Sequence, residues 1–67
     1  MRVKTRVFNL SRSRFQNISQ LASAMGVSVS QVYRVKEGSR PINQRFIVGA
    51  ARAFPRRRLG ELFYLED

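Results

Sequence analysis

The chain has 67 residues, which is enough for one domain with a small hydrophobic core. It contains neither cysteine nor histidine, so disulfides, thiolate metal sites and the most common zinc ligands and catalytic bases are excluded. We therefore expect no catalytic residues, no metal and no cofactor. No apolar run approaches the ~20 residues of a membrane-spanning helix, and none follows the first basic residues as in a signal peptide, so we expect a cytoplasmic protein.

Positive charge is concentrated in residues 1–58. This segment holds all thirteen basic side chains and a single acid, Glu37, an excess of twelve positive charges, whereas the tail at 61–67 is acidic. A basic surface attracts polyanions, and nucleic acid is the first candidate partner. Charge alone leaves two alternatives open, a basic protein without a polyanionic partner and a protein that binds acidic lipid.

The first two helices are predicted from apolar spacing and from capping residues. Apolar side chains near the N-terminus recur at helical intervals, which predicts a first helix at about residues 4–15. Asn17 is a favourable N-cap, and Gln20 three residues later completes a capping-box pair that starts a second helix. We expect this second helix to end at Gly26.

Three further helices follow in the same way. A third begins after Ser28, another capping residue, and ends at a loop where Gly38 permits a left-handed turn and Pro41 blocks continuation. A fourth is expected at about residues 43–54, and a short fifth helix or turn at about 59–65.

No segment shows sustained strand alternation. A strand competes with the helix only near residues 27–35, which are rich in valine, and there the later spacing of three favours the helix. The sequence therefore predicts an all-α fold, a compact bundle of four to five helices, in a single domain spanning residues 1–67.

Residues 18–37 meet the requirements of two helices that cross at a steep angle over a tight turn. Such a pair needs a small residue at the crossing, a glycine in the turn and apolar side chains toward the core. Ala22 and Gly26 supply the first two. The apolar contacts come from Leu21, Met25, Val27, Val32 and Val35. Together with the charge, this pattern favours a DNA-binding helix-turn-helix over an ordinary αα-hairpin.

Several segments together resemble one known family. They are Leu21-Ala22-Ser23-Ala24-Met25-Gly26-Val27-Ser28, Val32-Tyr33-Arg34, Glu37-Gly38, Arg40, Ala50-Ala51-Arg52-Ala53-Phe54 and Leu59-Gly60-Glu61-Leu62-Phe63. The chain resembles the Cro/C1-type (XRE) repressors of phages and bacteria over roughly residues 7–63. It departs from them at Phe15-Gln16, where a glycine is common, in having no acid in the second helix, and at Pro55-Arg56-Arg57-Arg58. The resemblance implies a lambda-repressor-like bundle and a sequence-specific transcriptional regulator, a repressor of phage, plasmid or bacterial type, associated with the nucleoid.

The resemblance also implies which residues contact bases, because in this family the third helix enters the major groove. The corresponding positions are Val29, Ser30, Tyr33 and Arg34. Arg34 is the first choice for a bidentate contact to guanine, with a phosphate contact or a solvated arginine as the alternatives. Val29 can meet a thymine methyl group or simply pack, and Tyr33 can reach a phosphate or cover the edge of the core.

Phosphate contacts are expected from helix N-termini and loops. The candidates are Asn17, Ser19, Gln20, Ser28, Gln31, Lys36, Arg40, Asn43 and Arg45. For Asn17 and Ser28, capping alone is the competing interpretation.

Two features of the C-terminal part stay open between alternatives. The Arg56-Arg57-Arg58 run is either a solvated charge run or pairs with the acids of the tail. A homodimer would suit a palindromic site, and its candidate contact surface is Phe63, Tyr64 and Leu65. The alternative for Phe63 is that it closes the chain's own core.

Rival functions are an antitoxin-like module that binds an acidic protein and a non-specific architectural nucleic-acid binder. RNA binding is disfavoured because Tyr33 is the only good stacking aromatic on the expected face. A homeodomain-like triple helix, as in recombinases, is the runner-up fold, but it does not need the amphipathic segment after Pro41. An enzyme is not expected, because the four acids form no obvious pair on a helical face.

Overall fold

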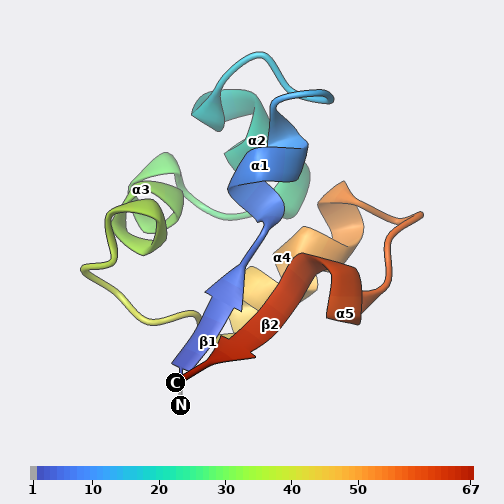
Figure 1. Cartoon of the computed structure of the whole chain (residues 1–67). Coiled ribbons are helices and arrows are strands. Elements are labelled where there is room, and N and C mark those ends of the chain that lie inside the picture. Colours follow the sequence, from blue (N-terminus) through green and yellow to red (C-terminus); the bar gives the residue numbers. More distant parts are fainter. Residues whose placement is uncertain (1) are drawn as a thin grey trace.

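The computed structural model describes residues 2–67, which form a mainly helical body closed by a two-stranded ribbon (Figure 1). The elements in chain order are β1 (Arg2–Thr5), α1 (Val7–Ser11), α2 (Ile18–Met25), α3 (Val29–Glu37), α4 (Gln44–Ala53), α5 (Leu59–Leu62) and β2 (Phe63–Glu66). The two strands bring the beginning and the end of the chain side by side. Because of this ribbon the fold is not purely α-helical.

The ribbon corrects the predictions made for both ends of the chain. β1 and β2 are antiparallel, with Val3 opposite Leu65 and Thr5 opposite Phe63. The first helix is therefore confined to Val7–Ser11 instead of about 4–15, and the last helix ends at Leu62. The expectation of a fold without strands was wrong, because the pairing joins segments some sixty positions apart and leaves no local periodicity to detect.

Thr5 explains why the strand gives way to a helix at this point. Its hydroxyl donates to the Leu62 carbonyl at 2.8 Å and accepts from the Val7 N–H at 3.1 Å. The Arg6 N–H donates to the same Leu62 carbonyl at 2.8 Å. One residue thus ends β1, satisfies a free amide of α1 and anchors both to the end of α5.

The N-caps predicted for α2 and α3 are confirmed, and α4 has an N-cap of the same kind. Asn17, Ser28 and Asn43 each accept, through the side-chain oxygen, from the backbone N–H three residues later. The Gln20 side chain accepts from the Gln16 N–H at 2.9 Å, one residue before the position that a capping box would use. Gly38 has a φ of +80°, the left-handed conformation expected where α3 ends.

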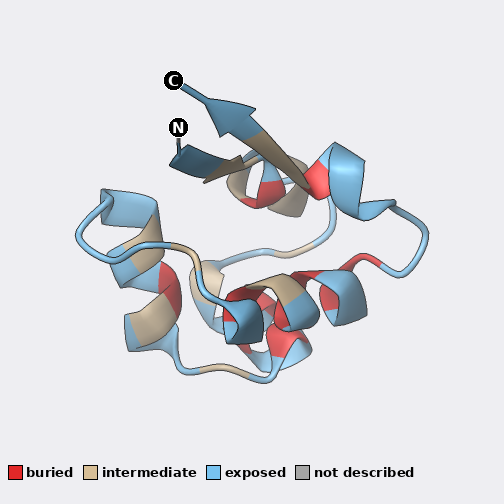
Figure 2. Cartoon of the chain, turned by 90° about the horizontal axis from the view of Figure 1, so that it is seen from below, coloured by how far each residue is buried: buried red, intermediate tan, exposed pale blue. Residues whose placement is uncertain are grey.

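The core lies where α2, α3 and α4 meet and is closed by Val7 and Leu62 from the two ends of the chain (Figure 2). Its buried members are Val7, Leu21, Ala22, Met25, Val32, Phe46, Ala50, Ala53, Phe54 and Leu62. Phe46 is its aromatic centre, with Phe8 and Phe63 each at a ring-centroid distance of 6.2 Å. Ala51 and Leu59 are exposed.

α4 approaches α2 closely at Gly49. A Cβ atom added at Gly49 would lie 2.7 Å from the Met25 carbonyl oxygen and 3.0 Å from the Met25 Cβ. Gly49 is buried, and its neighbour Ala50 is fully buried. The two backbones can therefore touch only because position 49 has no side chain.

We expect Gly49→Ala to lower the free energy of unfolding by up to about 2 kcal/mol. Overpacking of a tight core typically costs about 1–3 kcal/mol and exceeds the roughly 1 kcal/mol gained in helix propensity. The clash is with backbone, so no side-chain rotation can relieve it. Urea denaturation measures the change. Gly60→Ala is the matched control because an added Cβ meets nothing within 4 Å there. Equal stability of the two variants would contradict the packing argument.

Candidate nucleic-acid interface

A three-residue turn joins α2 to α3. Gly26 has a φ of +74°, and the Val27 N–H donates to the Ala22 carbonyl at 3.1 Å. Ser28 then caps α3, and its backbone N–H donates to the Gln31 side chain at 3.1 Å, which completes a capping box. The turn glycine and the cap predicted at these positions are confirmed. The local chemistry fixes how α3 leaves α2.

The four residues predicted to contact bases all lie exposed on α3. Val32 is fully buried on the opposite side of the helix. Ser30, Tyr33 and Arg34 fall on one outward side by helical spacing, and Val29 stands 40% exposed at the first position of the helix. Tyr33 is 48% exposed and does not cover the core. This side of α3 is therefore free to meet a partner.

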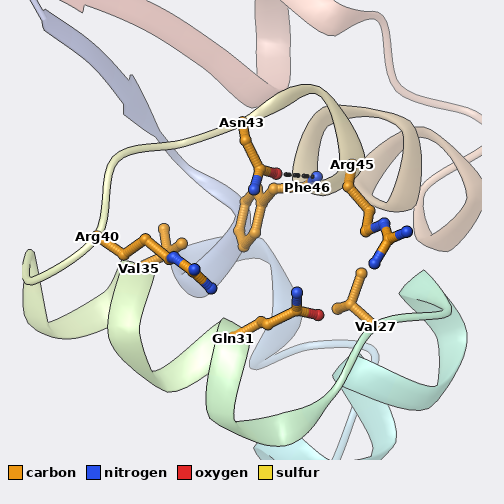
Figure 3. Close-up of a pocket in the computed structure, with 7 residues that line it drawn as sticks. All are labelled: Val27, Gln31, Val35, Arg40, Asn43, Arg45 and Phe46. Atoms are coloured by element: carbon orange, nitrogen blue, oxygen red, sulfur yellow. Dashed lines mark hydrogen bonds between the residues drawn. The ribbon is translucent and has the colours of Figure 1, made fainter.

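Four of the predicted phosphate-contacting residues surround one hollow between α3 and the start of α4 (Figure 3). They are Gln31, Arg40, Asn43 and Arg45. The apolar floor of the hollow is formed by Val27, Val35 and Phe46. Figure 3 shows the four polar side chains approaching this hollow from α3, from the following loop and from the beginning of α4. The structure thus brings residues from three segments of the chain together.

The loop that carries Arg40 is fastened to the end of α3. The Arg34 carbonyl accepts from the Ser39 N–H at 3.0 Å, from the Ser39 hydroxyl at 3.2 Å and from the Arg40 N–H at 3.2 Å. The same carbonyl also accepts from the N–H of Gly38, the C-cap of α3. The hydrogen bonds therefore hold the Arg40 backbone beside α3.

Capping uses only the side-chain oxygen of the amide residues at the starts of α2, α3 and α4. The side-chain oxygens of Asn17, Gln20, Gln31 and Asn43 accept backbone N–H groups. Their amide NH2 groups make no hydrogen bond within residues 2–67. A phosphate oxygen is an acceptor and needs such donors. Capping and phosphate contact are therefore compatible at the same residue.

The remaining predicted phosphate contacts lie apart from the hollow of Figure 3. Asn17 and Lys36 share a second hollow, at the loop between α1 and α2, with Arg12. Ser19 and Gln20 are exposed on the first turn of α2, and Ser28 lies in the turn before α3. The nine residues thus do not form one cluster.

Sequence reasoning missed two arginines close to these groups. Arg12 lines the second hollow, and a basic residue shortly before the Asn17 cap was the signal that could have indicated it. The Arg52 guanidinium lies near the turn, 3.5 Å from where a Cβ at Gly26 would stand. No local pattern links Arg52 to Gly26, because the α2–α4 packing alone brings them together.

The positive charge is almost entirely unpaired. The one ion pair among residues 2–67 joins Arg57 to Glu61 at 3.2 Å, with both side chains about half exposed. The pKa of Glu61 is lowered, first by the hydrogen bond from the Arg58 N–H and then by that from Arg57. Within the Arg56-Arg57-Arg58 run, Arg57 therefore pairs inside the chain. The cations around α3 carry no such partner in the described residues.

The residues predicted for a dimer contact are largely used inside the chain. Phe63 is half-buried and packs edge-to-face on Phe46, so it does close its own core. The Arg6 guanidinium lies 4.4 Å from the centre of the Tyr64 ring. Leu65, 63% exposed, is the one member of the three that presents a mainly free apolar side chain.

Comparisons with known proteins identify no relative of the chain. No protein-family model, curated protein or solved structure gives a match to the chain. Among the helices of residues 2–67, none is long and apolar enough to cross a membrane. The same residues contain no cluster of three acidic, cysteine or histidine side chains that could hold a metal ion. The function of the chain is therefore inferred from the residues described above.

We expect the Glu61 carboxyl to titrate below the ordinary range of a glutamate in the folded protein. Because folding lowers its pKa, its stabilising contribution is present above the unfolded pKa and is lost as the pH falls through the folded pKa. Carbon-detected NMR titration of the folded chain and of the urea-unfolded chain measures the difference. Arg57→Gln should keep part of the shift, since the Arg58 N–H is its largest cause. Identical titration of Glu61 in both states would refute this assignment.

Proposed function

We propose that the chain binds double-stranded DNA sequence-specifically and acts as a transcriptional regulator, most simply a repressor. In this proposal α2 and α3 work as a helix-turn-helix, with α3 in the major groove. The observation that carries it is an exposed, polar side of α3 flanked on two sides by unpaired cations and free amide donors. Such an arrangement suits a groove whose two walls are lined by phosphates.

Base readout is assigned to the outward residues of α3. Arg34 offers two parallel N–H donors that fit O6 and N7 of guanine, a contact that discriminates by about 1–3 kcal/mol against a wrong base. Ser30 can donate or accept and therefore discriminates weakly, and Val29 is placed to meet a thymine methyl group. The exposed Tyr33 is assigned to a phosphate through its hydroxyl group.

Phosphate positioning is assigned to the two groups on either side of α3. Arg40 and Arg45, together with the free amide groups of Gln31 and Asn43, would hold one phosphate strand. Lys36 and Asn17, with Arg12 beside them, would hold the other. These contacts fix register and supply most of the salt-dependent affinity, but carry no sequence information.

Selection of binding sites from random duplex DNA, at about 150 mM salt where non-specific contacts weaken, tests the proposal first. We expect an enriched motif, because α3 presents side chains suited to base edges. Half-sites about one helical turn apart in an inverted repeat would indicate binding as a pair. Strong binding at low salt without enrichment would refute sequence-specific regulation and leave an architectural binder. Absence of any DNA binding would leave an antitoxin-like protein module.

Two arginine variants separate base readout from phosphate contact. Arg34→Ala should weaken the selected site about 10-fold or more and relax specificity at one position, whereas Arg40→Ala should weaken all sequences alike. With about six to eight phosphates neutralised, log K should fall against log salt with a slope of roughly −5 to −7. Arg56→Ala is the matched control, since this arginine lies outside both groups. Equal, sequence-independent losses for Arg34 and Arg40 would remove the base-reading assignment.

A second copy of the chain is the partner that we propose at Leu65, because this apolar residue, opposite Val3 in the ribbon, stays 63% exposed. Leu65→Lys should reduce self-association in sedimentation and lower the affinity for an inverted repeat more than for a half-site. Leu59→Lys is the control, because Leu59 is similarly exposed, at 51%, on a different element. Unchanged sedimentation of the Leu65 variant would exclude this contact surface.

A further inference from the structure

An open hollow lies between the ribbon and the C-terminal end of α3. All four residues of β1 line one wall, and residues of α3 and of the loop after it line the others. The ribbon and α3 stand apart in the fold (Figure 1). The volume of the hollow is about 820 Å³, within the range of about 300–1,000 Å³ typical of ligand sites.

The wall formed by β1 is an unpaired strand edge. Arg6 donates to Leu62, so the alternation of an antiparallel ladder directs the N–H and C=O groups of Val3 and Thr5 away from β2. These four backbone groups make no hydrogen bond within residues 2–67. An unpaired edge of this kind is a template for one more strand.

The charge of the hollow limits which strand can add there. Its cations are Arg2, Lys4, Lys36 and Arg40, and its single acid is Glu37. None of them forms an ion pair in the described residues. The β1 edge of a second copy would bring Arg2 and Lys4 against their own counterparts, which is unfavourable. An acidic strand has the complementary charge.

The floor of the hollow is apolar. It is formed by the half-buried side chains of Phe8, Val35 and Ile42. Successive residues of a strand point to opposite sides, so an added strand can place apolar side chains on this floor and acidic ones toward the cations. A DNA phosphate strand would satisfy the cations but would leave both the floor and the free edge without partners.

We propose that this hollow binds an extended, acidic segment of another protein, in which acidic and apolar residues alternate, as a third strand beside β1. Val3 and Thr5 supply the backbone hydrogen bonds, Lys4 and Lys36 the charge, and the apolar floor takes the alternate side chains. The strand edge of Val3 and Thr5 belongs to neither phosphate-contacting group, whereas Lys36 and Arg40 line this hollow and are also assigned to phosphate.

The test uses the full chain and a capped hexapeptide of alternating Glu and Val as probe. Titration followed by amide NMR should give saturable binding, and hydrogen exchange should slow at the Val3 and Thr5 amides. The matched peptide of alternating Lys and Val has the same strand propensity and the opposite charge, so it should not bind. Failure of the Glu–Val peptide to bind, or equal binding of the Lys–Val peptide, would overturn the proposal.

A pair of substitutions at Val3 isolates the strand edge. Val3→Pro removes the outward N–H and leaves the ladder with β2 intact, since proline is tolerated at edge positions whose N–H faces away. It should weaken peptide binding about 10-fold, the order expected when one hydrogen bond is lost and its acceptor stays unsatisfied. Val3→Ala keeps the N–H and should retain most of the affinity. Equal binding by both variants would show attraction by charge alone and overturn strand addition.

Two further outcomes would also overturn it. The peptide could dissociate a self-associated form of the wild type, which would make a second copy the natural occupant. Duplex DNA could slow exchange at the Val3 and Thr5 amides, which would make the hollow part of the DNA surface.

If Val3→Pro fails to fold, the exchange of these two amides in the wild type, with and without peptide, still decides the question. Binding of the selected DNA site by Val3→Pro should be unchanged, so failure here is distinguishable from failure of the DNA proposal.

Discussion

The approach of α4 onto α2 at Gly49 and Met25 is the contact on which the rest of the structure depends. At this point the two helix backbones lie so close that a methyl group added at Gly49 would stand 2.7 Å from the Met25 carbonyl oxygen. Because α2 also packs against α3, the depth of this contact sets where α3 lies relative to the start of α4. The hollow of Figure 3 lies between those two elements. Core packing therefore positions surface residues such as Gln31 and Arg45 that take no part in the core.

The helix starts contribute to the fold and to the candidate interface with the same side chains. A cap takes the oxygen of Asn17 or Asn43 and leaves the amide donors outward. Capping contributes about 1 kcal/mol to a helix with or without a ligand. A donor held by a cap is also ordered before a phosphate arrives, which lowers the entropy lost on binding. The alternatives of a structural and a functional role at these residues are thus not exclusive, and the fold itself prepares the proposed interface.

The parts predictable from sequence are those determined within a few residues. The starts of α2 and α3 followed from the caps Asn17 and Ser28, because a cap needs only its own turn of helix, and the start of α4 near Asn43 followed from apolar spacing. The exposed side of α3 followed from helical spacing. The ribbon could not be found in this way, since a four-residue strand beside Thr5 gains its stability from a partner at the other end of the chain. The close contact at Gly49 could not be predicted for the same reason. The residues around it in sequence do not distinguish a helix glycine that touches Met25 from one that touches nothing, such as Gly60.

Glu37 connects the two proposed surfaces. It is the only acid in the first 58 residues and ends α3, where the helix dipole disfavours a negative charge and the neighbouring Arg34 and Lys36 offset it. At that end it lines the hollow beside β1. In the proposed DNA complex its charge would disfavour phosphate at the last residue of α3, beyond the positions from Val29 to Arg34 that are assigned to bases. Under both proposals, the same residue would mark where the DNA-facing side of α3 ends and the hollow beside the ribbon begins.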